Sequence, residues 1–298
     1  MMAKTKPIDQ KPLEQGGRIG VIAGGGRLPI DLVEELKAQG RAPFVILLAG
    51  EVENPHAFVG LPQTVLELEQ AGAAIARLKQ AGVTTLTMAG TVKRRVKVSR
   101  MRPILPLLPV LGRVVAAMRR GDDNLLRTVI AYVESHGIRV VGPHELMPDL
   151  LIGEGVHTKR KPGPEDRKNI DAGFAGARAI GGLDIGQASV AVGGRVIALE
   201  GIEGTEGLLH RVAGLRGHGR LAGRKGGVLV KCAKPGQEMR TDLPSIGVQT
   251  VEQAHAAGLN GIAVEAETSL ALGFKELIEK ADQLGVFVAG VRWNGNHG

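Results

Sequence analysis

Hydrophobic and polar positions along the chain alternate in a pattern that predicts strands followed by helices. The first apolar run, residues 18–23, is typical of a short strand and is closed by a triple glycine at 24–26. From Leu28 onwards apolar residues recur at helical spacing, with a proline near the first helical position, until Gly40 ends the pattern. The same order continues, with strands expected at 43–48, 83–89 and 138–141 and helices expected at 64–80 and 122–136. Such alternation is typical of a parallel sheet covered by helices.

A second unit of strands and helices is expected after a charged, proline-broken segment at 159–168. The apolar alternation at 188–199 predicts a β-hairpin that turns at Gly193 and Gly194. Further strands are expected at 227–231, 261–265 and 286–291, and helices at 169–180, 206–215, 251–257 and 274–284. The predicted fold class is therefore α/β, with an N-terminal Rossmann-like parallel-sheet domain at 18–150, a linker or loop at 151–168, and a C-terminal α/β domain with a mixed sheet at 169–298.

Composition narrows the class of protein. The chain has 298 residues, of which 43% are hydrophobic and 23% charged, so it is long enough for two globular domains. Aromatic residues make up only 2%, which argues against a surface that stacks the bases of nucleic acids. The single cysteine, Cys232, excludes internal disulfides and cysteine-rich zinc sites. Residues 1–17 read as a disordered leader or a remnant of cloning and lack the apolar stretch of a signal peptide, so we expect a cytoplasmic protein.

The net charge of +8 is unevenly distributed. Six bases fall within 93–102, directly before an apolar run at 103–111 that is interrupted by prolines. A basic segment of this kind fits nucleic acid, an anionic membrane surface, a phosphate-rich small ligand, or simply a solvated loop. The apolar neighbour favours contact with lipid.

Glycine-rich loops at two expected strand ends predict a ligand crevice. Ligands of parallel sheets bind at the carboxyl ends of strands, so residues 24–26 and 90–93 should line one crevice. The glycines at 24–26 fit a seat for a phosphate or a uridine edge, and they fit equally well a tight turn from strand to helix. The dinucleotide fingerprint is not satisfied, because Pro29 stands where its third glycine is required. The helix that follows Gly121 begins with Asp122, Asp123 and Asn124, of which one aspartate fits a helix cap and the others fit polar contacts in the crevice.

Acidic and basic residues also follow the expected strands of the second unit. Glu200 and Glu203 stand three residues apart between glycines, in a turn that suits a cation or phosphate site but also fits a simple hairpin turn. Lys231 ends an apolar strand, and Asp242 stands in a loop made rigid by prolines and glycines. Glu265 ends another strand. Carboxylates with a lysine and no histidine or cysteine cluster favour Mg²⁺ or Mn²⁺ and phosphoryl chemistry, in which metal and lysine neutralise phosphate oxygens and a carboxylate activates water.

Eight segments in order along the chain resemble one known family, the UDP-2,3-diacylglucosamine pyrophosphatases of the LpxI type. These segments are Ile19–Pro29, Ala89–Lys93, Gly121–Leu126, Leu183–Ala188, Glu200–Thr205, Lys231–Gln237, Asp242–Gly247 and Gly261–Ala266. The sequence departs from the family pattern at Arg94 and Arg95, where a single base and a proline are usual, and at Glu267, where glycine is usual.

The resemblance implies hydrolysis of the diphosphate bond of UDP-2,3-diacylglucosamine to UMP and 2,3-diacylglucosamine 1-phosphate (lipid X) in lipid A biosynthesis. It implies that water attacks the sugar-side phosphorus with help from Mg²⁺ or Mn²⁺, and that two domains enclose the substrate. The partners would be this lipid, its product and, peripherally, the anionic cytoplasmic face of the inner membrane, with no nucleic acid; a homodimer is left open.

The expected catalytic residues are Asp242, Glu200, Glu203 and Lys231, with Asp242 and Glu203 as metal ligands. The resemblance assigns the essential aspartate to Asp242, while the residue pattern alone assigns a phosphate to Lys231. Contacts with substrate are expected from Gly25, Gly26, Leu28, Thr91, Lys93, Asp122, Asn124, Gly204 and Thr205.

Two other functions fit parts of the sequence. A nicotinamide-dependent oxidoreductase would use the glycines at 24–26 with Glu51, and a non-enzymatic adaptor at a membrane surface or on nucleic acid would use the bases at 93–102. Neither accounts for the acidic residues and lysine at strand ends in the second half of the chain.

Overall fold

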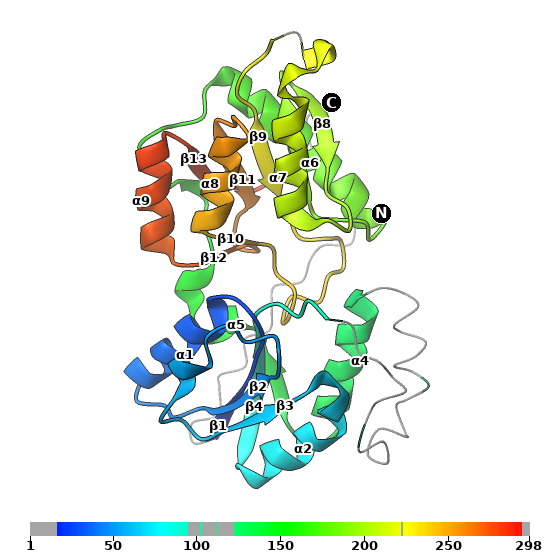
Figure 1. Cartoon of the computed structure of the whole chain (residues 1–298), viewed down its shortest axis with the longest axis vertical. Coiled ribbons are helices and arrows are strands. Elements are labelled where there is room, and N and C mark those ends of the chain that lie inside the picture. Colours follow the sequence, from blue (N-terminus) through cyan, green and yellow to red (C-terminus); the bar gives the residue numbers. More distant parts are fainter. Residues whose placement is uncertain (1–16, 95–101, 103–111, 113–121, 222, 294–298) are drawn as a thin grey trace.

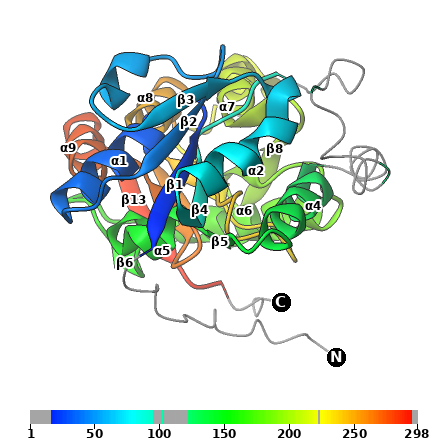
Figure 2. The ribbon, with the colours of Figure 1, turned by 90° about the horizontal axis from the view of Figure 1, so that it is seen from below.

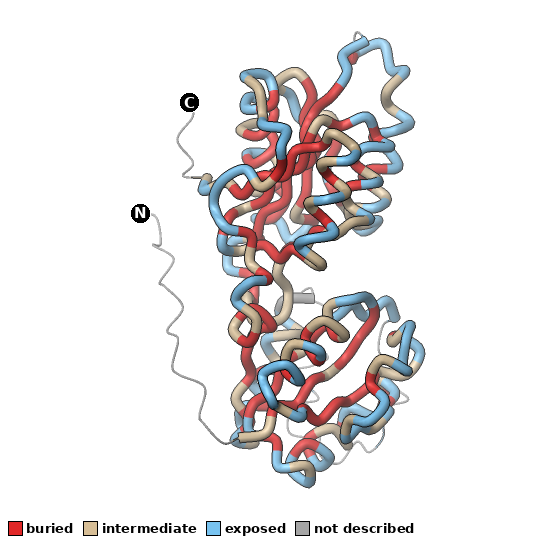
Figure 3. The backbone as a smooth tube through the Cα atoms, turned by 90° about the vertical axis from the view of Figure 1, so that its left-hand side faces the viewer, coloured by how far each residue is buried: buried red, intermediate tan, exposed pale blue. Residues whose placement is uncertain are grey.

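The computed structural model describes residues 17–94, 102, 112, 122–221 and 223–293, with Asp122 and Asp123 described by their backbone alone. Two lobes follow one another along the long axis of the molecule (Figure 1), and each has its own buried centre (Figure 3). We call residues 17–94 and 122–150 the N-terminal lobe and residues 152–293 the C-terminal lobe. Within the described chain, none of the helices combines the length and the apolar character needed to cross a membrane.

The N-terminal lobe contains a five-stranded sheet in the order β3-β2-β1-β4-β5, in which every pair of neighbours is parallel. This is the Rossmann strand order, and its switch point lies between β1 and β4. The strands are β1 (Arg18–Ala23), β2 (Phe44–Leu48), β3 (Gln63–Leu66), β4 (Val83–Ala89) and β5 (Arg139–Val141), and the helices are α1 (Leu28–Ala38), α2 (Ala71–Gln80), α4 (Asp122–Glu134) and α5 (Pro143–Leu146).

Helices cover both faces of this sheet (Figure 2). Leu32 and Leu36 of α1 pack with Val21 on one face. Leu78 of α2 and Ile130 of α4 belong to a second cluster on the other face. Because both faces of the central strands are buried, β1 and β2 consist mostly of apolar residues, which is why the sequence pattern predicted them.

The C-terminal lobe contains a six-stranded mixed sheet in the order β6-β13-β11-β9-β7-β8. Strands β9, β11 and β13 are parallel, whereas β6 and β7 run antiparallel to their neighbours. The strands are β6 (Gly155–Val156), β7 (Ala188–Val192), β8 (Arg195–Leu199), β9 (Val228–Lys231), β11 (Gly261–Glu265) and β13 (Phe287–Val291), with a separate parallel pair, β10 (Ser245–Ile246) and β12 (Leu270–Ala271). The α/β class with a parallel and a mixed sheet is confirmed.

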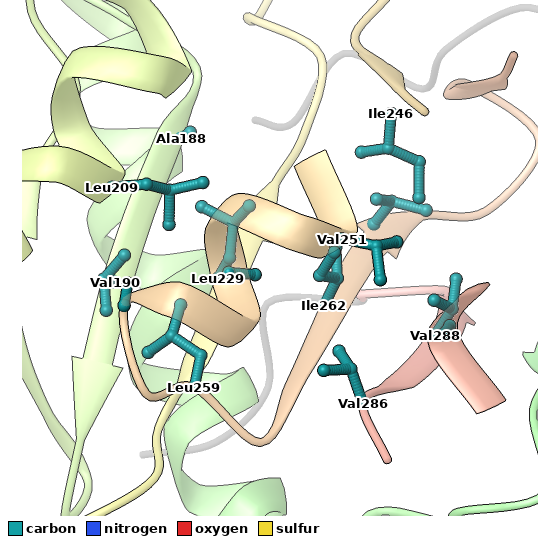
Figure 4. Packing of buried hydrophobic residues seen from close by; sticks show 14 of the residues in the cluster. Ala188, Val190, Leu209, Leu229, Ile246, Val251, Leu259, Ile262, Val286 and Val288 are labelled. Carbon is teal, nitrogen blue, oxygen red and sulfur yellow. The ribbon is translucent and has the colours of Figure 1, made fainter. Parts of the chain in front are cut away.

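Four helices cover the second sheet, namely α6 (Pro164–Gly182), α7 (Gly204–Gly214), α8 (Val248–Ala256) and α9 (Phe274–Leu284). Leu209 of α7 and Val251 of α8 pack on one face with Leu229 and Ile262 of the sheet (Figure 4). Phe174 of α6 belongs to the cluster on the other face. The loops at the carboxyl ends of the strands are thereby attached to a rigid, close-packed core.

The predicted hairpin is confirmed in β7 and β8, which pair antiparallel up to the contact of Val192 with Arg195. Gly193 and Gly194 between them have φ angles of 61° and 73°. Two consecutive positive φ values are what a two-residue type I′ turn requires, and glycine adopts them without steric cost.

Two predicted segments were wrong in part. Residues 64–66 are not helical but belong to β3, which pairs with β2, and α2 starts at Ala71 after a short 3₁₀ helix at Leu68–Gln70. The apolar spacing from residue 64 onwards fitted a helix, yet Val65 is 59% exposed, as one side of an edge strand can be. The segment 159–168 is not wholly a linker, because Pro164 begins α6 and Asp166 accepts the amide proton of Gly163 at 3.1 Å, which caps the helix.

Polar contacts join the two lobes. Arg27 at the start of α1 lies 3.3 Å from Glu276 of α9, and Arg240 of the C-terminal lobe lies 2.8 Å from Glu134 of α4. Because Arg27 follows the carboxyl end of β1 and Glu276 lies in the first turn of α9, the glycine loops of the N-terminal lobe face the C-terminal lobe.

Candidate functional site

Three charged residues follow strands that end at one edge of the C-terminal sheet. In the register of this sheet Lys231 of β9 lies opposite Ala188 of β7 and Val264 of β11. Since β8 returns antiparallel to β7, it ends at the same edge, so Glu200, Lys231 and Glu265 all stand there. The expected gathering of strand-end charges is thus what the topology produces.

Lys231 is the charged centre of this edge. Only 5% of its surface is exposed, and its Nζ donates a hydrogen bond to the carbonyl oxygen of Ser245 at 2.8 Å. Burial lowers the pKa of Lys231, while the negative charges of Glu200 and Asp242 act in the opposite direction. Both carboxylates therefore favour the charged form of the ammonium group.

Asp242 stands in the loop 232–244 that leaves β9. Its Oδ2 accepts a hydrogen bond from Nε2 of Gln237 at 2.7 Å, and its amide donates to the carbonyl oxygen of Glu238 at 3.2 Å. The residue is half-buried, so its carboxylate combines a fixed position with access to solvent. A carboxylate held in this way beside a lysine can orient a water molecule near a phosphate group.

Glu200 is held by hydrogen bonds on both oxygens. Its Oε1 accepts from the hydroxyl group of Thr205 at 2.7 Å, and its Oε2 accepts from the amide of Gln187 at 2.8 Å. Only 6% of the residue is exposed. Glu200 therefore shapes the turn and supplies negative charge to Lys231, while its oxygens are already engaged.

Replacing Glu200 with alanine is expected to destabilise the protein by about 1–3 kcal/mol, because the change leaves two partly buried donors without their acceptor and removes a negative charge that favours the buried ammonium of Lys231. Urea unfolding of the variant and the wild type would measure this difference. Glu206, an exposed carboxylate in the first turn of α7, is the matched control, and its alanine variant should change the unfolding free energy by less than about 0.5 kcal/mol. Equal effects of the two substitutions would contradict this role of Glu200.

Glu203 is turned towards α7. Its Oε1 lies 2.5 Å from Nη2 of Arg211, and the same Arg211 nitrogen also binds the carbonyl oxygen of Leu199. Among the residues that the structure describes, no three His, Cys, Asp or Glu side chains converge on a point that could hold a metal ion. The described side chains therefore fit a divalent cation in one way. The carboxylate of Asp242 would be its protein ligand, and phosphate oxygens of a bound molecule would supply further ligands.

Glu265 has a structural role at the same edge. One of its oxygens pairs with Arg178 of α6, and the other accepts the amide proton of Ala233 at 3.1 Å. Arg178 also lies over the ring of Trp293, 5.4 Å from its centroid. Burial, together with the charge of Glu265, raises the pKa of Cys232 to about 12, which makes this thiol a poor nucleophile.

The glycine loops of the N-terminal lobe are joined to each other. Gly25 and Thr91 exchange two backbone hydrogen bonds of 2.8 and 2.9 Å. A Cβ atom would lie 2.5 Å from the carbonyl oxygen of Thr91 if added to Gly24, and 2.5 Å from that of Gly25 if added to Gly90. Only glycine allows so close an approach, so the two loops form one continuous rim beside the start of α1, which carries Leu28.

Glu51 fixes this rim through hydrogen bonds to the backbone. Its carboxylate is 7% exposed and accepts the amide protons of Lys93 at 2.8 Å and Arg94 at 3.2 Å. A nicotinamide cofactor would need an acidic residue available to its ribose hydroxyl groups. Because both oxygens of Glu51 are engaged, the oxidoreductase alternative loses the residue that it depended on.

The remaining predicted contact residues are spread over both lobes. Gly26 and Asn124 are exposed, and Nζ of Lys93 lies 3.3 Å from Glu53. Gly204 begins α7. The side chain of Asp122 and most of the basic and apolar run at 93–111 lie outside the described residues.

The sequence analysis missed two glutamines that support the site. The side-chain amide of Gln237 donates to Asp242, whereas it is the backbone N–H of Gln187 that donates to Glu200. The buried Oε1 of Gln187 and Oγ1 of Thr241 lack a hydrogen-bond partner within the described residues. Glutamines next to these acidic motifs were visible in the sequence, but nothing in their spacing indicated which carboxylate they would meet.

Comparisons with known proteins cover nearly the whole described chain. Residues 18–150 match the model of the LpxI N-terminal domain, and residues 153–289 match that of the LpxI C-terminal domain. A relative from Caulobacter vibrioides, UDP-2,3-diacylglucosamine pyrophosphatase LpxI, is 40% identical over 278 residues, which cover 92% of this chain and 97% of the relative. A solved structure from Methylobacillus flagellatus, described as an NAD-dependent epimerase/dehydratase, aligns over 47% of this chain and 42% of that chain with 12% identity and a TM-score of 0.24, too low to support any conclusion.

Proposed function

The chain belongs to the LpxI family, and from this premise we propose that it hydrolyses the diphosphate bond of UDP-2,3-diacylglucosamine to give UMP and 2,3-diacylglucosamine 1-phosphate in lipid A biosynthesis. The observation that carries the proposal is the buried Lys231 at the sheet end where Glu200 also stands, on the strand from which the Asp242 loop leaves. A buried cation with carboxylates in its surroundings is suited to a diphosphate and a water molecule.

Each group has a distinct task in the proposed reaction. Lys231 attracts the phosphate oxygens and stabilises the negative charge that builds up on them as water attacks. Asp242, fixed by Gln237, orients that water and accepts its proton. The sugar-side phosphorus receives the new oxygen, and UMP leaves. In the N-terminal lobe, the start of α1 beside the glycine rim attracts the diphosphate through the helix dipole.

A divalent cation, Mg²⁺ or Mn²⁺, is part of the proposal. Asp242 would hold it together with phosphate oxygens of the substrate, and Glu203 would join only if it left Arg211. When bound, the ion would supply positive charge to the phosphate oxygens and lower the pKa of nearby water.

We also propose that the protein works at the cytoplasmic face of the inner membrane, where its lipid substrate would lie. Support comes from the six bases of 93–102 beside the apolar run 103–111, a combination suited to anionic lipid surfaces. Nucleic acid is not among the proposed partners.

The proposed function is tested by incubating the purified protein with UDP-2,3-diacylglucosamine in mixed micelles and identifying the products by mass spectrometry. UMP and the sugar 1-phosphate should form in equal amounts, a chelator should stop the reaction, and Mg²⁺ or Mn²⁺ should restore it. No change in nicotinamide absorbance should accompany turnover. Absence of UMP with either metal present would refute the proposal.

At alkaline pH, kcat/KM should begin to fall at a lower pH than it would if the essential lysine were exposed to solvent. Burial lowers the pKa of Lys231, so the ammonium loses its proton, and with it the charge that binds phosphate, as the pH rises through that lowered value. The dependence of kcat/KM on pH, from neutral to strongly alkaline, measures this limb. In a Lys231→Arg variant the charge persists, and the limb should be absent from whatever activity remains. An unchanged limb in that variant would assign it to another group.

A further inference from the structure

The loop that carries Asp242 is attached to the N-terminal lobe (Figure 1). Arg127 of α4 donates to the carbonyl oxygen of Gly236, and Arg240 lies 2.8 Å from Glu134, the last residue of α4. We propose that Glu134 is a positioning residue for Asp242, which acts from the opposite lobe through Arg240. The catalytic part of this inference rests on the proposed function, whereas the attachment of the loop does not.

Arg240 connects the two lobes with a single guanidinium group. Its Nε and Nη2 bind the two carboxylate oxygens of Glu238 at 2.8 and 3.0 Å, and its Nη1 binds Oε1 of Glu134 at 2.8 Å. The hydrogen bond from Arg240 lowers the pKa of Glu238, which is only 9% exposed. The planar geometry of arginine makes such a two-sided contact directional, so the position of Glu134 constrains that of Glu238.

Glu238 in turn determines where Asp242 lies. Its carbonyl oxygen accepts the amide protons of both Thr241 and Asp242, each at 3.2 Å. Gln237, its neighbour in the chain, holds Oδ2 of Asp242 at 2.7 Å. A shift of Glu238 would therefore move both the backbone and the carboxylate of Asp242.

Glu134 is itself fixed within its own lobe. The oxygen that contacts Arg240 also accepts the amide proton of Val140, in β5, at 3.4 Å. The side chain of Glu134, at the end of α4, thus binds both β5 of its own lobe and Arg240 of the other lobe. The Asp242 loop is therefore held against a rigid part of the N-terminal sheet.

The expected effect is on placement more than on folding. Side chains of Arg240 and Glu134 are 32% and 40% exposed, and ion pairs with such exposure contribute little to global stability. A small displacement of a catalytic carboxylate, by contrast, strongly lowers the rate of the chemical step. Loss of Glu134 should therefore lower kcat and leave KM and the melting temperature nearly unchanged.

The experiment compares two ion pairs between the same lobes. Glu134→Ala removes the contact to the Asp242 loop, and Glu276→Ala removes the contact to Arg27, which does not touch that loop. We expect kcat to fall about 5- to 20-fold in the first variant and less than about 2-fold in the second. Glu134→Gln retains an oxygen that can accept from both Val140 and Arg240, so it should keep more of the wild-type kcat than Glu134→Ala does.

A double-variant comparison tests whether Glu134 acts through Arg240. Glu134→Ala should add nothing to the loss of kcat already caused by Arg240→Ala, because the two residues would form one unit. Additive losses would overturn the proposal, as would equal effects of Glu134→Ala and Glu276→Ala.

Hydrogen–deuterium exchange without substrate separates this proposal from the proposed function. Peptides that span 232–244 should exchange faster in Glu134→Ala than in the wild type, and at the wild-type rate in Glu276→Ala. If the wild type failed to hydrolyse the lipid while this difference appeared, the proposed function would fail and the attachment of the loop would stand. Unchanged exchange in Glu134→Ala would overturn the attachment itself.

Discussion

Replacing Asp242 with asparagine is expected to lower kcat by about 10³-fold or more, because the amide cannot accept a proton from water or supply negative charge to a cation. Substrate affinity should change by less than about 5-fold, since asparagine is isosteric and still offers an oxygen to Gln237. Product release measured by mass spectrometry gives kcat, and titration calorimetry with the intact substrate gives the dissociation constant.

Asp184 provides the matched control for this substitution. It is an exposed carboxylate that pairs with Lys234 at 2.8 Å near the same edge of the sheet. Asp184→Asn removes the same charge but should retain kcat within about 3-fold. Activity of Asp242→Asn above about one per cent of the wild-type value would exclude the catalytic role of Asp242, since losing a proton acceptor should cost orders of magnitude.

Replacing Lys231 with methionine is expected to lower kcat/KM by about 10²- to 10³-fold, because a charge positioned against the phosphate oxygens is lost in a site shielded from water. Methionine fills a similar volume, so packing around the strand end is largely kept. The substitution also removes the hydrogen bond from Lys231 to the carbonyl oxygen of Ser245, so the variant should unfold at a lower urea concentration. Steady-state kinetics and urea unfolding measure the two effects.

Lys234, three residues along the same loop, is the control for Lys231. It pairs with the exposed Asp184, and its methionine variant should change kcat/KM by less than about 3-fold. Lys231→Arg separates charge from stability, because it restores the positive charge but not the fit of the buried ammonium. If Lys234→Met and Lys231→Met were equally impaired, general loss of positive charge would explain the result and a specific role of Lys231 would be excluded.

Much of the fold was predictable because the central strands of both sheets are buried on both faces. Continuous apolar runs such as 18–23 and 261–265 leave little doubt about a strand, and their order with intervening helices predicts a parallel arrangement. The order of strands also predicted that Glu200 and Lys231 lie at the same edge of the sheet, since strands that run in the same direction end at the same edge. The edge strand β3 was missed because one of its faces is exposed and its apolar spacing also fitted a helix.

The pairing of individual charges could not be predicted. Glu203 looked like a partner of Asp242 in the sequence, yet it pairs with Arg211 on the outside of α7. Contacts such as that of Arg240 with Glu134 join residues 106 positions apart, and no local pattern encodes them. Glu51 likewise looked available for a ribose, because a sequence does not show that two backbone amides would occupy its oxygens.

Hydrolysis in water labelled with heavy oxygen shows which phosphorus the water attacks. In the proposed reaction, water oriented by Asp242 attacks the sugar-side phosphorus of the diphosphate. One turnover by the wild-type protein should therefore place the label in the phosphate of 2,3-diacylglucosamine 1-phosphate and leave UMP unlabelled, as read by mass spectrometry of both products. Label in UMP, or no cleavage of the diphosphate bond, would contradict the account.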